Sequence, residues 1–367
     1  MIRLLIVDDS PLMRRLLGSI FEAEGDFVVG MARDGAEAIE LLPTFAPDVV
    51  TLDINMPRMD GLTCLDRIMI ERPCPVVMFS SMTDEGAAET MEALHLGAVD
   101  FIPKPEGAVS LAIDTLAPRL VEKVRAAAAA RLKPSLRLRD RVRARTGLAR
   151  WTPPREAPSP VPPRPVPRAV PGGKTAEGLV LVGTSTGGPQ ALDALLTTLP
   201  PDFSWPILVA QHMPASFTGA LARRLDTICA LPVTEVLAPT QIQSGHIYIA
   251  RGDADMIVRR QGRGLIAAAA PSDPGHRWHP SVDRLVRSAL AAVPADRLVG
   301  VLMTGMGNDG AAAMTALRAQ GGRTLAEAEE SAVVWGMPGE LVRAGGADIV
   351  APLDMLGKHL VDTVRSR

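Results

Sequence analysis

Five polar residues in the N-terminal third of the chain stand where apolar runs end. Asp8 and Asp9 directly follow the first run, and Asp53, Ser80 and Lys104 stand at the ends of later ones. Neighbouring carboxylates repel one another unless a cation joins them, and hard oxygen ligands suit Mg²⁺. A lysine and a hydroxyl beside the cation can hold phosphoryl oxygens. We therefore expect an aspartyl phosphate on Asp53, formed by in-line attack, with the metal ion and Lys104 absorbing charge.

A second group of residues, in the C-terminal half, has the types needed for ester or amide hydrolysis. Ser185 follows the run GLVLVGT, His212 follows ILVAQ, and Asp309 lies in a glycine-rich turn after LVGVLM. A nucleophile, a base and an orienting carboxylate at strand ends of one sheet meet the roles of a Ser-His-Asp triad. The order Ser, His, Asp and the lack of a GxSxG elbow make ordinary lipases and esterases poor matches.

Each of these residues also has a structural interpretation. A single acidic pair after a strand is usually a helix N-cap, Ser185 taken alone favours a helix N-cap, and a lone histidine is usually structural. The turn LMTGMGNDGA also spells GxGxxG, a dinucleotide-binding pattern, with Glu327 and Glu329 about 20 residues onward. That pattern comes late in its domain, and Asp309 would oppose a pyrophosphate there. We expect no nucleotide at this turn.

Both groups depend on parallel strands whose carboxyl ends meet at one edge of a sheet, where such folds bind ligands. Residues 1–125 alternate short apolar runs with helical spacing, which predicts a five-stranded, doubly wound parallel sheet. The expected strands are 2–7, 26–31, 48–52, 76–79 and 98–102. Residues 177–367 resume this alternation and predict a larger, Rossmann-like α/β domain, with a helix from Pro189 to Leu199.

A linker is expected between the two domains, over residues 126–176. Residues 131–172 hold eleven basic and two acidic residues, and proline dominates residues 151–173. These patterns predict a polyproline-like basic tether, preceded over 121–150 by a fraying helix. An anionic partner or a PxxP ligand is the alternative. The rest of the chain carries a net charge of -11, which disfavours a nucleic-acid-binding body.

The length and composition of the chain limit the classes of protein to which it can belong. The 367 residues are 47% hydrophobic and 22% charged, which suits two globular domains. No apolar stretch approaches the roughly 18 residues of a membrane span, and MIRLLIVDDS reaches acids before a secretory segment could form. A cytoplasmic monomer is expected, since no coiled-coil heptads occur. Three cysteines without CxxC spacing are expected to be buried apolar side chains.

The motifs VDDS, LDINMPRMDG, FSSMT and DFIPKP resemble a two-component response-regulator receiver domain, over residues 1–125. The resemblance implies that Asp53 is the phosphoacceptor and that Asp8 and Asp9 form an acid pocket for Mg²⁺. Asn55, which replaces an acid of close relatives, would offer the metal its backbone carbonyl. The family's switch hydroxyl, switch aromatic and lysine are matched by Ser80, Phe101 and Lys104.

The motifs GTSTGGPQAL, QHMPASFT, HPSVDRLVRSA and LMTGMGNDGA resemble the catalytic domain of the chemotaxis protein-glutamate methylesterases, from residue 178 to 364. The resemblance implies that Ser185 is the nucleophile, His212 the general base and acid, and Asp309 its orienting carboxylate. The Met306 backbone N–H would stabilise the oxyanion, and Thr186 would line the site. No metal is expected in this domain. Thr184 and Trp278 depart from the family's usual alanine and polar residue.

The combined resemblance implies phosphorylation-regulated hydrolysis of glutamyl methyl esters on methyl-accepting chemotaxis receptors, with release of methanol. Glutamine deamidation is left open. A chemotaxis histidine kinase would be the phosphodonor, and contact with membranes would occur only through receptor arrays. We expect the unphosphorylated receiver to cover the cleft that holds Ser185. Two alternatives are a response regulator with a DNA-binding output, disfavoured by the acidic output region, and a signalling scaffold with a degenerate triad, which only an activity measurement separates from an enzyme.

Overall fold

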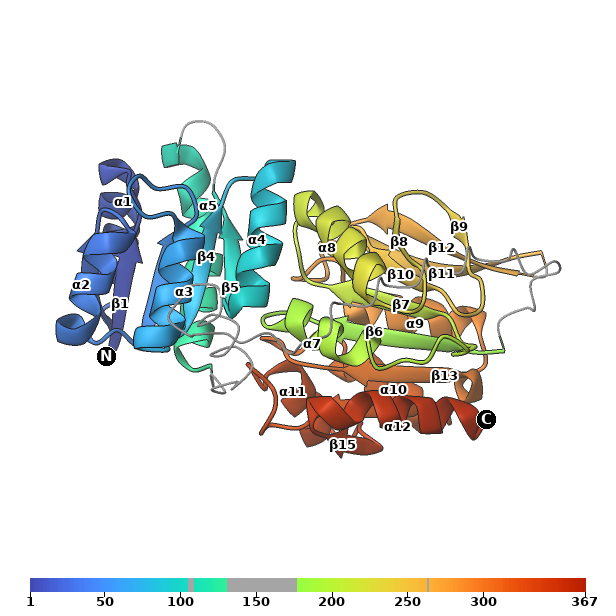
Figure 1. Ribbon diagram of the computed structural model, residues 1–367. Coiled ribbons are helices and arrows are strands. Elements are labelled where there is room, and N and C mark those ends of the chain that lie inside the picture. The colour runs from blue at the N-terminus through green and yellow to red at the C-terminus, as the bar shows by residue number, and fades with distance from the viewer. Residues whose placement is uncertain (105–108, 131–176, 263) are drawn as a thin grey trace, which may run out of the picture.

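The computed structural model describes residues 1–104, 109–130, 177–262 and 264–367, which form two α/β domains (Figure 1). The prediction of two parallel-sheet domains is confirmed. The predicted linker, residues 126–176, lies outside the described residues except for 126–130, and helix α5 (Val109–Ala128) reaches into its start. Among the helices of the described ranges, none has the length and apolar character to cross a membrane.

The N-terminal domain is a five-stranded parallel sheet in the order β2-β1-β3-β4-β5. The predicted strands agree with the observed ones to within two residues. The strands are β1 (Ile2–Val7), β2 (Phe27–Ala32), β3 (Val49–Asp53), β4 (Val76–Ser80) and β5 (Asp100–Pro103). The helices before α5 are α1 (Pro11–Ala23), α2 (Gly35–Phe45), α3 (Gly61–Glu71) and α4 (Asp84–Leu96). Helices cover both faces of the sheet, so β1, β3 and β4 are apolar along nearly their whole length.

The C-terminal domain contains a seven-stranded parallel sheet in the order β15-β14-β13-β6-β7-β10-β8. Because β13, β6 and β7 are neighbours, their carboxyl ends meet at one edge. The strands are β6 (Leu179–Thr184), β7 (Ile207–Gln211), β8 (Val233–Val236), β10 (Ile247–Ala250), β13 (Leu298–Leu302), β14 (Arg323–Glu327) and β15 (Ile349–Ala351). The helices are α7 (Gly188–Leu196), α8 (Ala215–Ile228), α9 (Val282–Ala292), α10 (Ala311–Ala319), α11 (Met337–Arg343) and α12 (Leu353–Arg365).

A separate antiparallel sheet was not anticipated from the sequence. It consists of β9 (Thr240–Gln241), β11 (Ala254–Gln261) and β12 (Gly264–Pro271), in the order β11-β12-β9. Helix α9 packs against β11. This arrangement places the start of α9 beside the carboxyl end of β13, which is where the predicted triad lies.

The cysteines are buried thiols, as expected. Cys64, Cys74 and Cys229 form no disulfide and are enclosed in the hydrophobic cores. Burial raises the pKa of Cys64 and of Cys74 to about 12. Since a thiolate is the reactive form of cysteine, these two side chains act as apolar packing groups at neutral pH.

Candidate functional site

The predicted acidic cluster assembles at the carboxyl edge of the N-terminal sheet. Ligand atoms of Asp8, Asp9 and Asp53 all lie within 4.8 Å of one another. Lys104 Nζ lies 2.7 Å from Asp53 Oδ2 and 3.4 Å from Asp8 Oδ2. Asp8 is fixed in the turn after β1, where its Oδ1 accepts a hydrogen bond from Ser10 N at 2.9 Å. The three carboxylates provide a set of oxygen ligands that suits Mg²⁺, and the lysine lies beside this set.

The charges of Asp53 and Lys104 depend on each other. Burial raises the pKa of the Asp53 carboxyl, and the hydrogen bond from Lys104 opposes that rise. Burial alone would lower the pKa of Lys104, but the hydrogen bond and the charge of Asp53 outweigh it and hold that pKa above its usual value. Lys104 therefore stays a cation beside Asp53 at neutral pH. Asn55 is exposed, and its N–H approaches Asp53 Oδ1 at 3.4 Å.

The two predicted switch residues of the receiver are both buried. Ser80 Oγ donates to the carbonyl of Gly86, in the first turn of α4, at 3.0 Å. Phe101 packs against Phe217 of α8, in the other domain, with the ring centroids 4.3 Å apart. The aromatic residue chosen from the sequence is therefore part of the contact between the domains.

The three predicted triad residues lie beyond the ends of adjacent strands. Ser185 follows β6, His212 follows β7, and Asp309 lies in the turn after β13. His212 Nε2 lies 2.8 Å from Asp309 Oδ2. His212 Nδ1 is buried and makes no hydrogen bond, so this nitrogen is free to accept a proton from the serine hydroxyl. No hydrogen bond joins Ser185 Oγ and His212 in this structure.

Asp309 is held as a carboxylate by donors that surround it. Burial tends to raise its pKa, but the hydrogen bond and charge of His212 and the backbone N–H groups of Asp283 and Val282 keep it below the usual value. Val282 N donates to Oδ2 at 2.7 Å, and Asp283 N donates to Oδ1 at 3.0 Å. Ser281 Oγ donates to Oδ1 at 3.1 Å. These groups form the start of α9, whose positive dipole end favours an anion.

Sequence reasoning missed this support for Asp309. The signal was present, because Ser281 begins α9 in the motif HPSVDRLVRSA and accepts from Arg284 N at 3.3 Å. The motif was recognised only as part of the family resemblance. Ser281 and Asp309 are 28 residues apart in the sequence, and no pattern in the sequence indicates that they are in contact.

The helix-cap interpretation of Ser185 does not hold. Helix α7 begins after Gly187, which has a φ of 75°, and no side chain caps it. Ser185 instead lies in the tight turn between β6 and α7. A Cβ at Gly305 would lie 2.7 Å from Ser185 Cβ, so the absence of a side chain there lets the Met306 loop approach the serine.

In the GxGxxG turn, side chains of this protein take up the places that a dinucleotide would need. A side chain at Gly307, whose φ is 83°, would meet the Trp278 ring. Glu327 is fully buried behind the turn, where its Oε2 accepts from Thr304 N at 2.8 Å and its Oε1 accepts from Ser331 Oγ at 2.9 Å. The acid that a dinucleotide-binding site would use for a ribose therefore holds the loop.

Two side chains extend the site from His212 toward the other domain. The Trp278 ring is stacked parallel to the His212 ring, with centroids 6.0 Å apart, and the Arg277 guanidinium lies over the Trp278 ring. Arg277 forms an ion pair with Glu122 of α5. A cavity beside this ion pair is lined by α5, Arg277 and Met306.

The N-terminal domain packs directly against the turn that carries Ser185. Gly187 N donates to Val99 O at 3.2 Å, and Gln190 Nε2 donates to Ala98 O at 2.8 Å and also to the carbonyl of Leu94. Helix α4 faces α8 and α7 across this boundary (Figure 1). The segment between α4 and β5 therefore contacts the residues next to the serine.

Thr186, predicted to line the substrate site, takes part in this contact. Its hydroxyl donates to Asp100 Oδ2 at 2.5 Å, and Asp100 Oδ1 accepts from Lys123 Nζ at 2.7 Å. Thr186 is 2% exposed. In this arrangement the hydroxyl of Thr186 is engaged by the N-terminal domain and is closed off from solvent.

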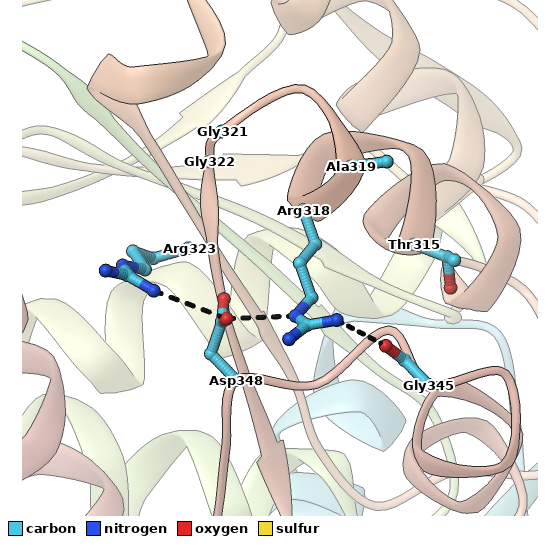
Figure 2. Close-up of a pocket in the computed structure, with 8 residues that line it drawn as sticks. All are labelled: Thr315, Arg318, Ala319, Gly321, Gly322, Arg323, Gly345 and Asp348. Atoms are coloured by element: carbon cyan, nitrogen blue, oxygen red, sulfur yellow. Dashed lines mark hydrogen bonds and ion pairs between the residues drawn. The ribbon is translucent and has the colours of Figure 1, made fainter.

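A surface pocket elsewhere in the C-terminal domain has no relation to either site. Figure 2 shows Arg318 and Arg323 converging on Asp348, at 2.9 and 3.4 Å. The pocket lies where β14 begins, at the sheet edge opposite the triad. Since Asp348 also accepts from Thr324 N at 3.0 Å, this group joins β14 to the segment before β15.

Comparisons with known proteins agree with the two domains. The family model described as the response regulator receiver domain matches residues 4–113, and that described as the CheB methylesterase matches residues 180–360. The chain is 55% identical to a protein-glutamate methylesterase/protein-glutamine glutaminase of Rhodopseudomonas palustris, over 99% of this chain and 98% of the relative. It is 50% identical to one of Rhodospirillum rubrum, over 98% and 95%.

Among solved structures, the chain is similar to the CheB methylesterase catalytic domain of Thermotoga maritima, with 35% identity and a TM-score of 0.49 over 50% of this chain and 97% of that one. The methylesterase family model and the full-length relatives show that the output domain is a methylesterase domain rather than a DNA-binding one. From the full-length relatives and the two matched domains, the chain belongs to the family of CheB-type protein-glutamate methylesterase/protein-glutamine glutaminases with an N-terminal receiver domain.

Proposed function

We propose that Ser185, His212 and Asp309 carry out the methylesterase and glutaminase reactions of this family on glutamyl side chains of chemoreceptors. The observation that carries the proposal is the 2.8 Å contact of His212 Nε2 with Asp309, which leaves the buried Nδ1 free to take the serine proton. Methanol released from a methylated receptor fragment measures the first activity. Ammonia released from a fragment with glutamine at the same position measures the second. Release of neither product would contradict the proposal.

The reaction follows from the roles of these groups. Ser185 Oγ attacks the ester carbonyl carbon while its proton passes to His212 Nδ1, and the Met306 N–H stabilises the negative oxygen. His212 returns the proton to the departing methoxide, which leaves as methanol. Water, deprotonated by His212, then attacks the acyl-serine and releases a glutamate carboxylate. With a glutamine substrate the same steps release ammonia. Asp309 stabilises the imidazolium that forms in each half of the reaction.

The N-terminal domain is proposed to accept a phosphoryl group on Asp53 from a chemotaxis histidine kinase. Its acidic cluster suits Mg²⁺, which Asp8, Asp9, Asp53 and the backbone carbonyl of Asn55 would hold. When bound, the ion neutralises charge on the transferring phosphoryl oxygens. Lys104, already 2.7 Å from Asp53, contributes a further positive charge to those oxygens.

Replacing Asp53 with asparagine abolishes labelling by a small phosphodonor such as acetyl phosphate, because an amide cannot form the acyl phosphate. Mass spectrometry of the intact protein measures the label. Asp60→Asn is the matched control, since Asp60 lies outside the cluster and caps α3, where its side chain accepts from Thr63 N. A base-labile label retained at full stoichiometry in Asp53→Asn would place the phosphoacceptor elsewhere.

Regulation is proposed to act through the contact between the domains. With Thr186 engaged by Asp100 and Gly187 bonded to Val99, the N-terminal domain occupies the surface on which a receptor helix would have to dock to reach the partly exposed Ser185. Phosphorylation would weaken this contact through Ser80, whose hydroxyl bonds to the first turn of α4, and through Phe101, which packs on Phe217 of α8. A shift from 1% to 99% open corresponds to about 5.5 kcal/mol of differential stabilisation.

The variant Gln190→Ala raises the hydrolysis rate measured without a phosphodonor. It removes the hydrogen bonds to Leu94 O and Ala98 O, each worth about 0.5 to 1.5 kcal/mol net. A combined loss near 1.4 kcal/mol increases the open fraction about tenfold. Gln320→Ala, exposed at the end of α10, is the control and leaves the basal rate unchanged. An unchanged basal rate in Gln190→Ala would contradict closure by this contact.

A further inference from the structure

The side chain of Gln211 joins the backbone of the serine turn to the backbone of His212. Gln211 is the last residue of β7, pairs with Thr184 of β6, and is 2% exposed. Its Nε2 donates to Ser185 O at 2.9 Å and to His212 O at 3.1 Å. Its Oε1 accepts from Thr184 Oγ1 at 2.5 Å. One carboxamide therefore contacts both segments that carry the proposed nucleophile and base.

The orientation of this carboxamide is determined by its partners. Two carbonyl oxygens can only accept, so the nitrogen of Gln211 must face Ser185 and His212. The oxygen then faces Thr184, whose hydroxyl must donate. A Cβ at Gly188 would overlap Gln211 Oε1, so the second glycine of the motif TSTGG provides the space that the carboxamide occupies. The departure from alanine at position 184 thus supplies a specific donor.

The carboxamide acts where the regular ladder has ended. The strand pairing of β6 with β7 stops at Thr184 and Gln211, after which the two segments of the chain continue into α7 and α8. Other backbone bonds remain here, from Gly188 N to Ser185 O at 2.8 Å and from His212 N to Thr184 O at 3.0 Å. The Gln211 side chain adds two hydrogen bonds from one nitrogen, which link the carbonyl of Ser185 to the carbonyl of His212.

We propose that Gln211, oriented by the Thr184 hydroxyl, is a positioning residue for hydrolysis, an inference that rests on the proposed roles of Ser185 and His212. Gln211 touches neither the reacting atoms nor the proton that moves. It holds the two peptide units from which the serine and imidazole side chains extend. A misplacement of about 1 Å between reacting groups can cost about 100-fold in rate, so a bond of this kind affects turnover more than substrate binding.

The test compares Gln211→Met and Thr184→Val with the wild-type chain. Methionine keeps the length of the side chain without its hydrogen bonds, and valine keeps the shape of threonine without its hydroxyl. We expect kcat for methanol release, with phosphodonor present, to fall about 10- to 100-fold in Gln211→Met. A fall of about 3- to 10-fold is expected in Thr184→Val. KM stays within about twofold in both, since the receptor contacts are unchanged.

The matched control is Thr324→Val. Thr324 is a fully buried strand threonine of β14 whose hydroxyl donates to Gly346 O at 2.5 Å, away from the triad. This variant loses a similar buried hydrogen bond, so its thermal midpoint falls as in Thr184→Val while its kcat stays at the wild-type value. Thr184→Ser restores the hydroxyl and recovers most of the activity. A cooperative thermal transition of the C-terminal domain verifies that this domain is folded in each preparation.

Equal kcat in wild type and Gln211→Met, at temperatures well below either midpoint, would overturn this inference while leaving the triad assignment intact. An equal loss of kcat in Thr184→Val and Thr324→Val would also overturn it, because the effect would then follow stability alone. Absence of methanol release from the wild-type chain would overturn the triad assignment and this inference together. If Gln211→Met fails to fold, the Thr184→Val and Thr184→Ser pair decides the question.

Discussion

Replacing Ser185 with alanine lowers kcat for methanol release by about five to six powers of ten, leaving only the background that substrate binding and the oxyanion donor provide. In the proposed mechanism the acyl intermediate forms on Ser185 Oγ. The neighbouring hydroxyls of Thr184 and Thr186 cannot replace it, because they donate to Gln211 and Asp100. The measurement is methanol released from a methylated receptor fragment in the presence of a phosphodonor.

Phosphorylation of Asp53 serves as the control for Ser185→Ala. Asp53 and its partner Lys104 lie in the other sheet, so labelling by acetyl phosphate proceeds as in the wild type. Methanol release at the wild-type rate by a fully labelled Ser185→Ala chain would show that a different nucleophile is used.

Replacing Asp309 with asparagine lowers kcat by about 10⁴-fold, because it reverses the tautomer of His212. Asp309 Oδ1 accepts from Ser281 Oγ and Asp283 N, so the asparagine oxygen remains on that side. Its NH₂ group then takes the place of Oδ2, where it loses the bond from Val282 N and faces His212 Nε2, which must accept. The ring proton moves to Nδ1, the nitrogen that has to take the proton of Ser185.

The fall in kcat comes from the changed tautomer of His212, and the Asp309→Asn chain remains folded. Asp348→Asn is the control, since Asp348 is also a mostly buried aspartate that accepts from a backbone N–H, at the opposite sheet edge. It lowers stability and leaves kcat unchanged. A histidine ¹⁵N NMR spectrum reports the ring tautomer directly. Wild-type turnover in Asp309→Asn, or an unchanged tautomer, would contradict the role given to this carboxylate.

Much of the parallel architecture could be predicted because it is local in sequence. Apolar runs with a polar residue after them, such as 2–7 before Asp8 or 48–52 before Asp53, became strands that end within one residue of the expected place. The antiparallel sheet could not be predicted in this way. Strand β12 contains four consecutive alanines, Ala267–Ala270, which have low strand propensity, and it is held as a strand by its pairing with β11.

The candidate site was predictable to the extent that strand ends determine it. The types and positions of Ser185, His212 and Asp309 were sufficient to expect them at one edge. The support for Asp309 from α9 and the engagement of Thr186 by Asp100 were not, because they join segments 26 to 86 residues apart that carry no shared pattern. The domain boundaries at 125 and 177 stay predictions.

The central claim is tested most directly by methanol release from a methylated receptor fragment, measured on one preparation of the full chain before and after a phosphodonor is added. We predict slow release at first and a marked acceleration once Asp53 is labelled. No methanol from a chain that is fully labelled on Asp53 would contradict hydrolysis by the proposed triad, and release that is fast and identical in both states would contradict its control by the receiver domain.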